Sequence, residues 1–118
     1  MATTQWTLLF GNVAGKVWTT TISTGDTSAP LSVDNSPAEQ VSVQIVGTIG
    51  GSTIVVQGSL DAVNYNTIND KNGNAMSYTA IGVLIGVGPT IVRMQVAVTA
   101  GAAAGLTVNV FVPQRLQQ

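Results

Sequence analysis

The chain has 118 residues, 45% of them hydrophobic and 8% charged, with a net charge of −1 and neither cysteine nor histidine. A single domain is expected at this length, the apolar content excludes global disorder, and four cations in all are too few for a nucleic-acid footprint. Because histidine and cysteine supply most zinc ligands and histidine is the usual general base, we expect that the protein is not an enzyme and holds no cofactor.

Patterns typical of β-strands follow one another along the chain. Val, Ile and Thr account for about a third of the residues, and β-branched side chains favour strands over helices. In chain order, strands are predicted at 5–10, 16–23, 41–49, 54–60, 63–69, 76–80, 81–87, 92–99 and 106–112. Alternation of apolar and polar residues, as in half-buried antiparallel strands, is clearest in 41–49, 54–60, 92–99 and 106–112.

Turn residues separate these segments. The Gly-Gly-Ser segment 50–52 predicts a tight hairpin between its two flanking strands, because glycine adopts a positive φ without penalty. The segment 70–74 contains an Asn-Gly pair and predicts a second turn, and 101–105 forms a third connection. Prolines and small polar residues are frequent in 24–39, so a long surface loop is expected there.

No segment shows a sustained helical period with caps, so almost no helix is expected. The sequence therefore predicts one all-β domain over 1–118, a single antiparallel β-sandwich. A jelly roll is the candidate topology and a barrel is the alternative. Residues 1–12 are expected to form an extended N-terminal arm, and residues 113–118 a polar tail.

The charged residues are few and lie apart in the sequence. The N-terminus lacks the basic and apolar regions of a signal peptide, and the apolar stretch 80–92 is too short to span ~30 Å of hydrocarbon, so no membrane partner is expected. A surface with so little charge suits a protein that lies against copies of itself. A small monomeric polar β-domain is the alternative.

Two acidic turns are candidates for chemistry. Asp70, Asn72 and Asn74 place oxygen atoms at positions one, three and five, as in a calcium loop. Ile81 stands where that loop needs a bidentate Glu, so a hydrogen-bonded hairpin turn is favoured. Asp61 and Asp70 are also a possible carboxylate pair of a glycosidase. Both lie in turns where solvent keeps them ionised, so a turn-capping role is favoured.

Aromatic residues mark two candidate contact sites. Trp6 and Phe10 share a face of the first predicted strand. They belong either to the core or, if that strand is an arm, to a contact with a neighbouring subunit, where buried aromatics dominate the binding energy. Tyr65 lies between two asparagines. It either stacks on a ligand or covers one end of the core with its hydroxyl group in solvent.

The middle of the chain resembles a motif of phage proteins. Residues 56–65 read VQGSLDAVNY and residues 68–78 read INDKNGNAMSY. They resemble the pattern GS-x-DG-x-NW-x-x-L-x-D-x-x-GN of small β-rich virion proteins of tailed bacteriophages, including capsid decoration (cement) proteins, and of repeats in tail and fibre proteins. Ala62 and Tyr65 stand in place of the usual glycine and tryptophan, and the resemblance extends over 41–112.

The resemblance implies a structural virion protein that binds to the assembled lattice of the major capsid protein as a homotrimer, with no catalytic residue or cofactor. We expect it to be made in the host cytoplasm and located in the virion. The candidate assembly contacts are Trp6, Leu8, Phe10, Pro30, Leu31 and Val33. The alternative is a carbohydrate- or receptor-binding module of a phage tail or fibre, with ligand contacts from Asp61, Tyr65 and Asn66.

Overall fold

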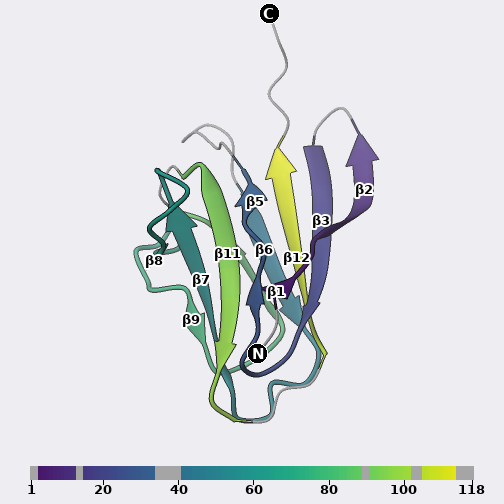
Figure 1. Cartoon of the computed structure of the whole chain (residues 1–118), viewed down its shortest axis with the longest axis vertical. Coiled ribbons are helices and arrows are strands. Elements are labelled where there is room, and N and C mark those ends of the chain that lie inside the picture. The colour runs from purple at the N-terminus through teal and green to yellow at the C-terminus, as the bar shows by residue number, and fades with distance from the viewer. Residues whose placement is uncertain (1–2, 13–14, 34–40, 89–90, 102–104, 114–118) are drawn as a thin grey trace, which may run out of the picture.

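A computed structural model of the chain describes residues 3–12, 15–33, 41–88, 91–101 and 105–113. Within these ranges the regular structure consists of twelve strands, and Figure 1 shows how they are arranged. They are β1 (Thr3–Thr4), β2 (Thr7–Asn12), β3 (Gly15–Ile22), β4 (Thr27–Ser28), β5 (Leu31–Ser32), β6 (Ser42–Val46), β7 (Thr53–Ser59), β8 (Asn66–Thr67), β9 (Ser77–Tyr78), β10 (Val83–Gly86), β11 (Arg93–Thr99) and β12 (Leu106–Pro113).

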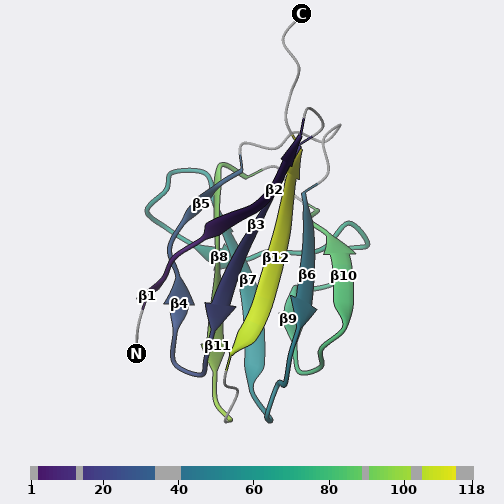
Figure 2. The ribbon, with the colours of Figure 1, turned by 90° about the vertical axis from the view of Figure 1, so that its right-hand side faces the viewer.

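The strands form two sheets that face each other across the core, as the two views in Figure 1 and Figure 2 show. The first, sheet A, has the order β1-β4-β11-β7-β8, with β5 also beside β11 and β9 beside β7. The second, sheet B, has the order β10-β6-β12-β3-β2. Every pair is antiparallel except β1 with β4.

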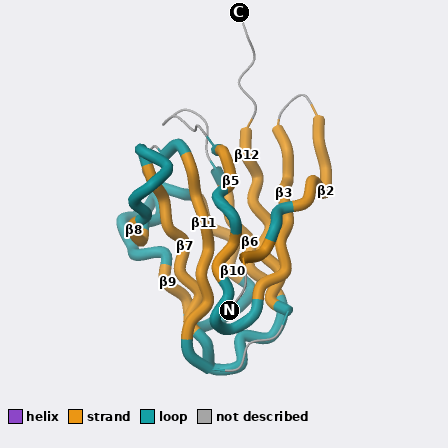
Figure 3. Tube along the Cα trace, in the orientation of Figure 1, coloured by secondary structure: helices purple, strands orange, loops and turns teal. Residues whose placement is uncertain are grey.

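The chain winds between the two sheets as a jelly roll. From β3 in sheet B it passes to β4 and β5 in sheet A, then to β6 in sheet B and to β7, β8 and β9 in sheet A. It returns to β10 in sheet B, crosses to β11 in sheet A and ends with β12 in sheet B. Two sheets wound in this way are the jelly-roll architecture. The predicted all-β sandwich is confirmed, and the described residues contain strands and loops without helix (Figure 3).

The glycine-rich turn at 50–52 connects the two sheets. The sequence predicted a hairpin here, and that prediction is wrong, because β6 pairs with β12 and β10 whereas β7 pairs with β11. The turn packs against the connection from β11 to β12: the hydroxyl of Ser52 donates to the carbonyl oxygen of Ala100 over 2.6 Å. A Cβ atom at Gly101, where φ is +65°, would overlap the backbone of Gly51.

Alternating residues of both sheets form the core between them. The predicted apolar faces of the four clearest strands are confirmed by the burial of their members. Leu60 and Gly47 are exceptions: Leu60 is 71% exposed in the turn after β7, and Gly47 is exposed directly after β6. The fully or nearly fully buried side chains include Ile22, Val41, Val43, Ile45, Ile54, Val56, Met76, Met94, Val96, Val98, Leu106, Val108 and Val110.

Two predicted irregular segments contain regular structure. The long loop expected at 24–39 holds β4 and β5, and both strands pair with β11. Two-residue strands have no alternation that sequence analysis can detect, which is why the loop prediction missed them. Residues 34–40 of that segment and 114–118 of the predicted tail lie outside the described residues, while Pro113 is the last residue of β12.

Candidate functional site

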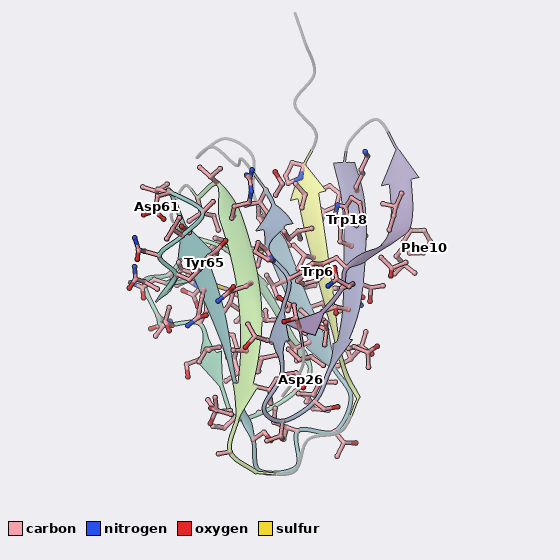
Figure 4. All side chains as sticks on the ribbon, in the orientation of Figure 1. Trp6, Phe10, Trp18, Asp26, Asp61 and Tyr65 are labelled. Carbon is pink, nitrogen blue, oxygen red and sulfur yellow. The ribbon has the colours of Figure 1, made fainter. Side chains whose placement is uncertain are left out.

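The N-terminal segment crosses from one sheet to the other at the side of the sandwich. β1 runs beside β4 in sheet A, and β2 runs beside β3 in sheet B. Trp6 lies between them, partly buried against the core, and donates its indole N–H to the carbonyl oxygen of Ala29 over 2.7 Å (Figure 4). The Thr20 hydroxyl donates to the Thr4 hydroxyl over 2.9 Å. Trp6, one of the candidate assembly contacts, therefore fastens the chain to its own sandwich.

The edge strand β2 exposes three large apolar side chains. Leu8, Leu9 and Phe10 are 47%, 48% and 66% exposed. Leu8 pairs with Trp18 and Phe10 with Val17, so a bulge at Leu9 shifts the register. Phe10 consequently lies on the face of sheet B that points away from sheet A. Leu8 and Phe10 remain surface candidates, and sequence analysis missed Leu9 because a bulge leaves no trace in the alternation.

Three other assembly candidates come from the predicted loop. Leu31 and Val33 are only 7% and 4% exposed and belong to the core. The backbone N–H of Val33 also donates to the carbonyl oxygen of Val92 over 3.0 Å. The prediction that Leu31 and Val33 are assembly contacts is wrong, because their side chains fill the interior of the sandwich. Pro30 is exposed.

The outer face of sheet B carries a row of apolar side chains. Phe10 on β2 lies opposite Val17 on β3, Val17 lies opposite Phe111 on β12, and the row continues to Ser42 on β6. A shallow hollow of about 130 Å³ lies beside this row. Its far wall is Leu84 on β10, which is 70% exposed. Phe111 had a sequence signal that was not used: it stands on the polar side of the alternating segment 106–112.

The hollow combines apolar walls with amide groups. The side-chain N–H of Asn109 donates to Oε1 of Gln44 over 3.1 Å, and Oδ1 of Asn109 is buried without a hydrogen-bond partner in the described structure. No described side chain that faces outward from sheet B is charged. The residues that line the hollow are Val17, Ser42, Gln44, Leu84, Asn109 and Phe111.

Asp61 closes the turn that follows β7. Its Oδ1 accepts hydrogen bonds from the backbone N–H groups of Asn64 and Val63 over 2.8 and 2.9 Å, and from the Ser59 hydroxyl over 2.8 Å. Its Oδ2 accepts one from the side chain of Asn64 over 2.7 Å. The backbone donors, with the two side-chain donors after them, hold the pKa of Asp61 well below its usual range. Asp61 is thus the cap of its own turn.

A second hollow of about 360 Å³ lies beside this turn. Two of the three candidate ligand contacts, Asp61 and Asn66, line it together with Ile68 and Ile91. Tyr65 does not belong to the lining. The Tyr65 side chain is half-buried, and its hydroxyl oxygen is buried without a hydrogen-bond partner among the described residues.

Asp70 serves the second acidic turn. Its Oδ1 accepts hydrogen bonds from the backbone N–H groups of Asn72 and Asn74 over 2.8 and 3.0 Å, and its carbonyl oxygen accepts one from Gly73 over 3.0 Å. This is the hydrogen-bonded hairpin turn that the sequence favoured over a calcium loop. In the part of the chain that the structure describes, no three acidic, histidine or cysteine side chains gather at one place where a metal ion would bind.

The chain is similar to solved structures in its fold, whereas the sequence comparisons find no match. No protein-family model matches the chain, and no curated protein matches it. Among solved structures, the SPBc2 prophage-derived protein YomS superimposes with a TM-score of 0.58 at 10% identity, over 90% of this chain and 99% of that chain. A cupin family protein with a double-stranded β-helix fold from Methanocaldococcus jannaschii gives 0.55 at 13% identity, over 93% and 80%. A cupin domain from Bordetella pertussis gives 0.55 at 12% identity, over 97% and 96%.

These likenesses show the fold and correct one expectation. From the missing histidine and cysteine we expected that the protein is not an enzyme; the comparisons contradict that expectation, because the fold is shared with cupin proteins as well as with a prophage protein and does not exclude an enzyme. One jelly-roll architecture serves capsid, lectin and cupin proteins, so function must be argued from sites. Separately, no helix within the described ranges is long and apolar enough to cross a membrane.

Proposed function

We propose that the chain is a structural component of a tailed-bacteriophage particle, which binds to the outside of the assembled head as a decoration protein. The observation that carries this proposal is the uncharged outer face of sheet B with its exposed apolar residues, Phe10 and Leu84 foremost. The proposed partners are the lattice of the major capsid protein and other copies of this chain, and the proposed location is the virion.

The physical reason is the difference in free energy between burying apolar side chains and burying charged groups. An exposed apolar patch on an otherwise polar protein marks an interaction surface. Burial of Phe10 or Leu84 gains free energy, and no charged group on this face has to be stripped of water. A protein with this face binds through apolar contact and amide hydrogen bonds. Many copies that bind only the assembled lattice stabilise it by mass action.

Two other features support the phage assignment. Ser59 and Asp61 match the Ser and Asp of the resembled motif, and both form hydrogen bonds in the turn. The Ser59 hydroxyl accepts a hydrogen bond from the Ala62 N–H over 2.9 Å and donates one to Asp61. The fold likeness to a prophage-derived protein is in line with the same origin. The order of three in the expected homotrimer rests on the resemblance alone.

A binding experiment with phage heads tests the proposal. Heads assembled without this chain are mixed with the purified protein and sedimented, and the bound protein is measured against its concentration. We expect saturable binding with a fixed number of copies per head. Phe10→Asp should weaken binding about tenfold or more, while Leu60→Asp, an equally exposed apolar position in the turn after β7, should not. Absence of cosedimentation would overturn the proposal.

The tail or fibre module is the second reading and has less support. All the hydrogen bonds of the Asp61 carboxylate described above lie within its own turn, so few acceptor positions remain for a sugar hydroxyl. A glycan array distinguishes the two functions: binding that is lost on Asn66→Ala, combined with no binding to heads, would favour the tail module.

A further inference from the structure

We infer that a second copy of this chain docks on the outer face of sheet B, with Phe10 of each copy seated in the hollow between Phe111 and Leu84 of the other. This inference deepens the proposed function and rests on it, because of the two kinds of partner proposed there it assigns this face to a second copy of the chain. It is carried by a protruding side chain and a matching hollow on one uncharged surface.

Phe10 is the protruding group. It is 66% exposed, and it stands on β2, which is the edge strand of sheet B. The bulge at Leu9 turns Phe10 to the outer face, where its own row supplies only Val17 as a neighbour in the pairing register. An aromatic ring exposed to this extent has most of its apolar surface still to bury.

The hollow lies on the same face, toward the opposite edge of the sheet. Phe111 on β12 and Leu84 on β10 form its two apolar sides, with Gln44 of β6 between their strands. Leu84 is as exposed as Phe10, at 70%. A Phe10 ring placed between Phe111 and Leu84 buries the two exposed side chains, Phe10 and Leu84, in a single contact.

The relative positions of these groups suit a two-fold axis. β2 is the first strand of sheet B, and the hollow spans the third to the fifth strands, β12, β6 and β10. Phe10 and Phe111 belong to one row across the sheet. Rotation by 180° about an axis that runs along the strands, between β3 and β12, therefore brings each Phe10 over the hollow of the other copy. Such an isologous contact is the commonest kind in homo-oligomers.

The absence of charge favours a partner whose own surface is uncharged. The described outward side chains of sheet B include none with a charge. A charged partner surface would lose water on this face without gaining an ion pair. A second copy presents the same uncharged face and has no such cost.

The size of the face sets the strength of the contact. Five strands about 4.8 Å apart, with about six residues each, cover on the order of 500 Å². A lasting interface buries about 800 Å² of accessible surface on each partner. We therefore expect a dimer that dissociates on dilution and is held more firmly when many copies bind one particle.

Paired charge substitutions test the reciprocal geometry. Sedimentation equilibrium of the full chain measures the mass of Phe10→Asp alone, of Leu84→Lys alone and of an equal mixture. Each variant should dimerise about tenfold more weakly than the wild type. In a heterodimer of the two variants, the carboxylate introduced at position 10 faces the ammonium group introduced at position 84 of the partner. The second contact is still between Phe10 and Leu84, so heterodimers should form. Leu60→Lys, at a position 71% exposed outside sheet B, is the control for Leu84→Lys and should not restore dimers with Phe10→Asp.

The outcomes separate this inference from the proposed function. A dimer in the wild type and its recovery in the mixture support the inference. A monomer at every concentration, a trimer, or a mixture without heterodimers overturns it. If the protein stays monomeric but still cosediments with phage heads, the inference fails while the proposed function stands; if it dimerises but never binds heads, only the proposed function fails.

Discussion

Trp6 donates its indole N–H to the carbonyl oxygen of Ala29 over 2.7 Å. The bond fixes the segment between β1 and β2 to the edge of sheet A, where the Ala29 N–H also donates to the carbonyl oxygen of Thr4 over 2.7 Å. β2 reaches the edge of sheet B from this attachment point. The position of Phe10 on the outer face of sheet B therefore depends on a contact with sheet A.

Trp6→Phe keeps an aromatic ring but leaves the Ala29 carbonyl without this donor. We expect the free energy of unfolding to fall by about 1–2 kcal/mol, as measured by urea denaturation. Leu60→Gln, which removes an exposed apolar side chain, should change it by less than about 0.5 kcal/mol. Equal effects of the two substitutions would contradict the role given to Trp6.

Ser52→Ala tests the junction of turns at one end of the sandwich. The Ser52 side chain is fully buried, donates to Ala100 over 2.6 Å and lies 2.7 Å from the Thr24 hydroxyl. Ser52→Ala removes the hydrogen bond from this buried side chain to Ala100, while the Thr24 hydroxyl still donates to the same carbonyl oxygen over 3.2 Å, so a loss of about 0.5–1.5 kcal/mol is expected. Ser77→Ala, at an exposed position on β9, is the control and should be nearly neutral. A neutral Ser52→Ala would show that the junction adds nothing to stability.

Ala62→Gly should stabilise the protein. Ala62 has a φ of 62°, in the left-handed region that favours glycine. Relief of this strain is expected to raise the free energy of unfolding by up to about 1 kcal/mol. Ala97→Gly, in the middle of β11, should lower it instead. The thermal midpoints of the two variants should therefore move in opposite directions, and a lower midpoint for Ala62→Gly would contradict the strain.

Asp61→Asn tests the charge in the first acidic turn. The pKa of Asp61 is lower in the folded protein than in the unfolded chain. Its ionised form therefore stabilises the fold at neutral pH, and that contribution is lost as the pH falls below about 4 toward the folded value. The wild type should be more stable than Asp61→Asn at neutral pH, and the difference should shrink as the pH is lowered from about 6 to about 2. Parallel pH profiles from urea denaturation would refute this.

The sequence predicts the faces of the long strands but not their partners. Alternation placed Val43, Met94 and Val108 in the core because each lies on the apolar side of a long segment. The turn at 50–52 was also predicted, yet a turn signal does not say which sheet the next strand joins. The jelly-roll winding depends on contacts between residues far apart in the chain, such as Val43 with Val110.

The candidate site was predicted only in part for similar reasons. Phe10 was singled out, but the bulge at Leu9 shifts the phase of β2, so Trp6 and Phe10 do not share a face as the simple alternation suggests. Leu84 had no signal of its own, because its exposure follows from its place on the outward side of β10, the edge strand of sheet B. Leu31 was wrongly predicted to be a surface contact, because its segment has the composition of a loop. The two-residue strand β5 instead buries its side chain.

The most direct test of the central claim is the temperature at which phage heads that lack this chain come apart, measured with and without the purified protein. A protein that binds only to the assembled lattice must stabilise that lattice against disassembly. We predict that the disruption temperature rises with protein concentration until the sites are filled, and that Phe10→Asp shifts this rise to higher concentrations. A disruption temperature that does not change at any concentration of the wild-type protein would contradict the claim.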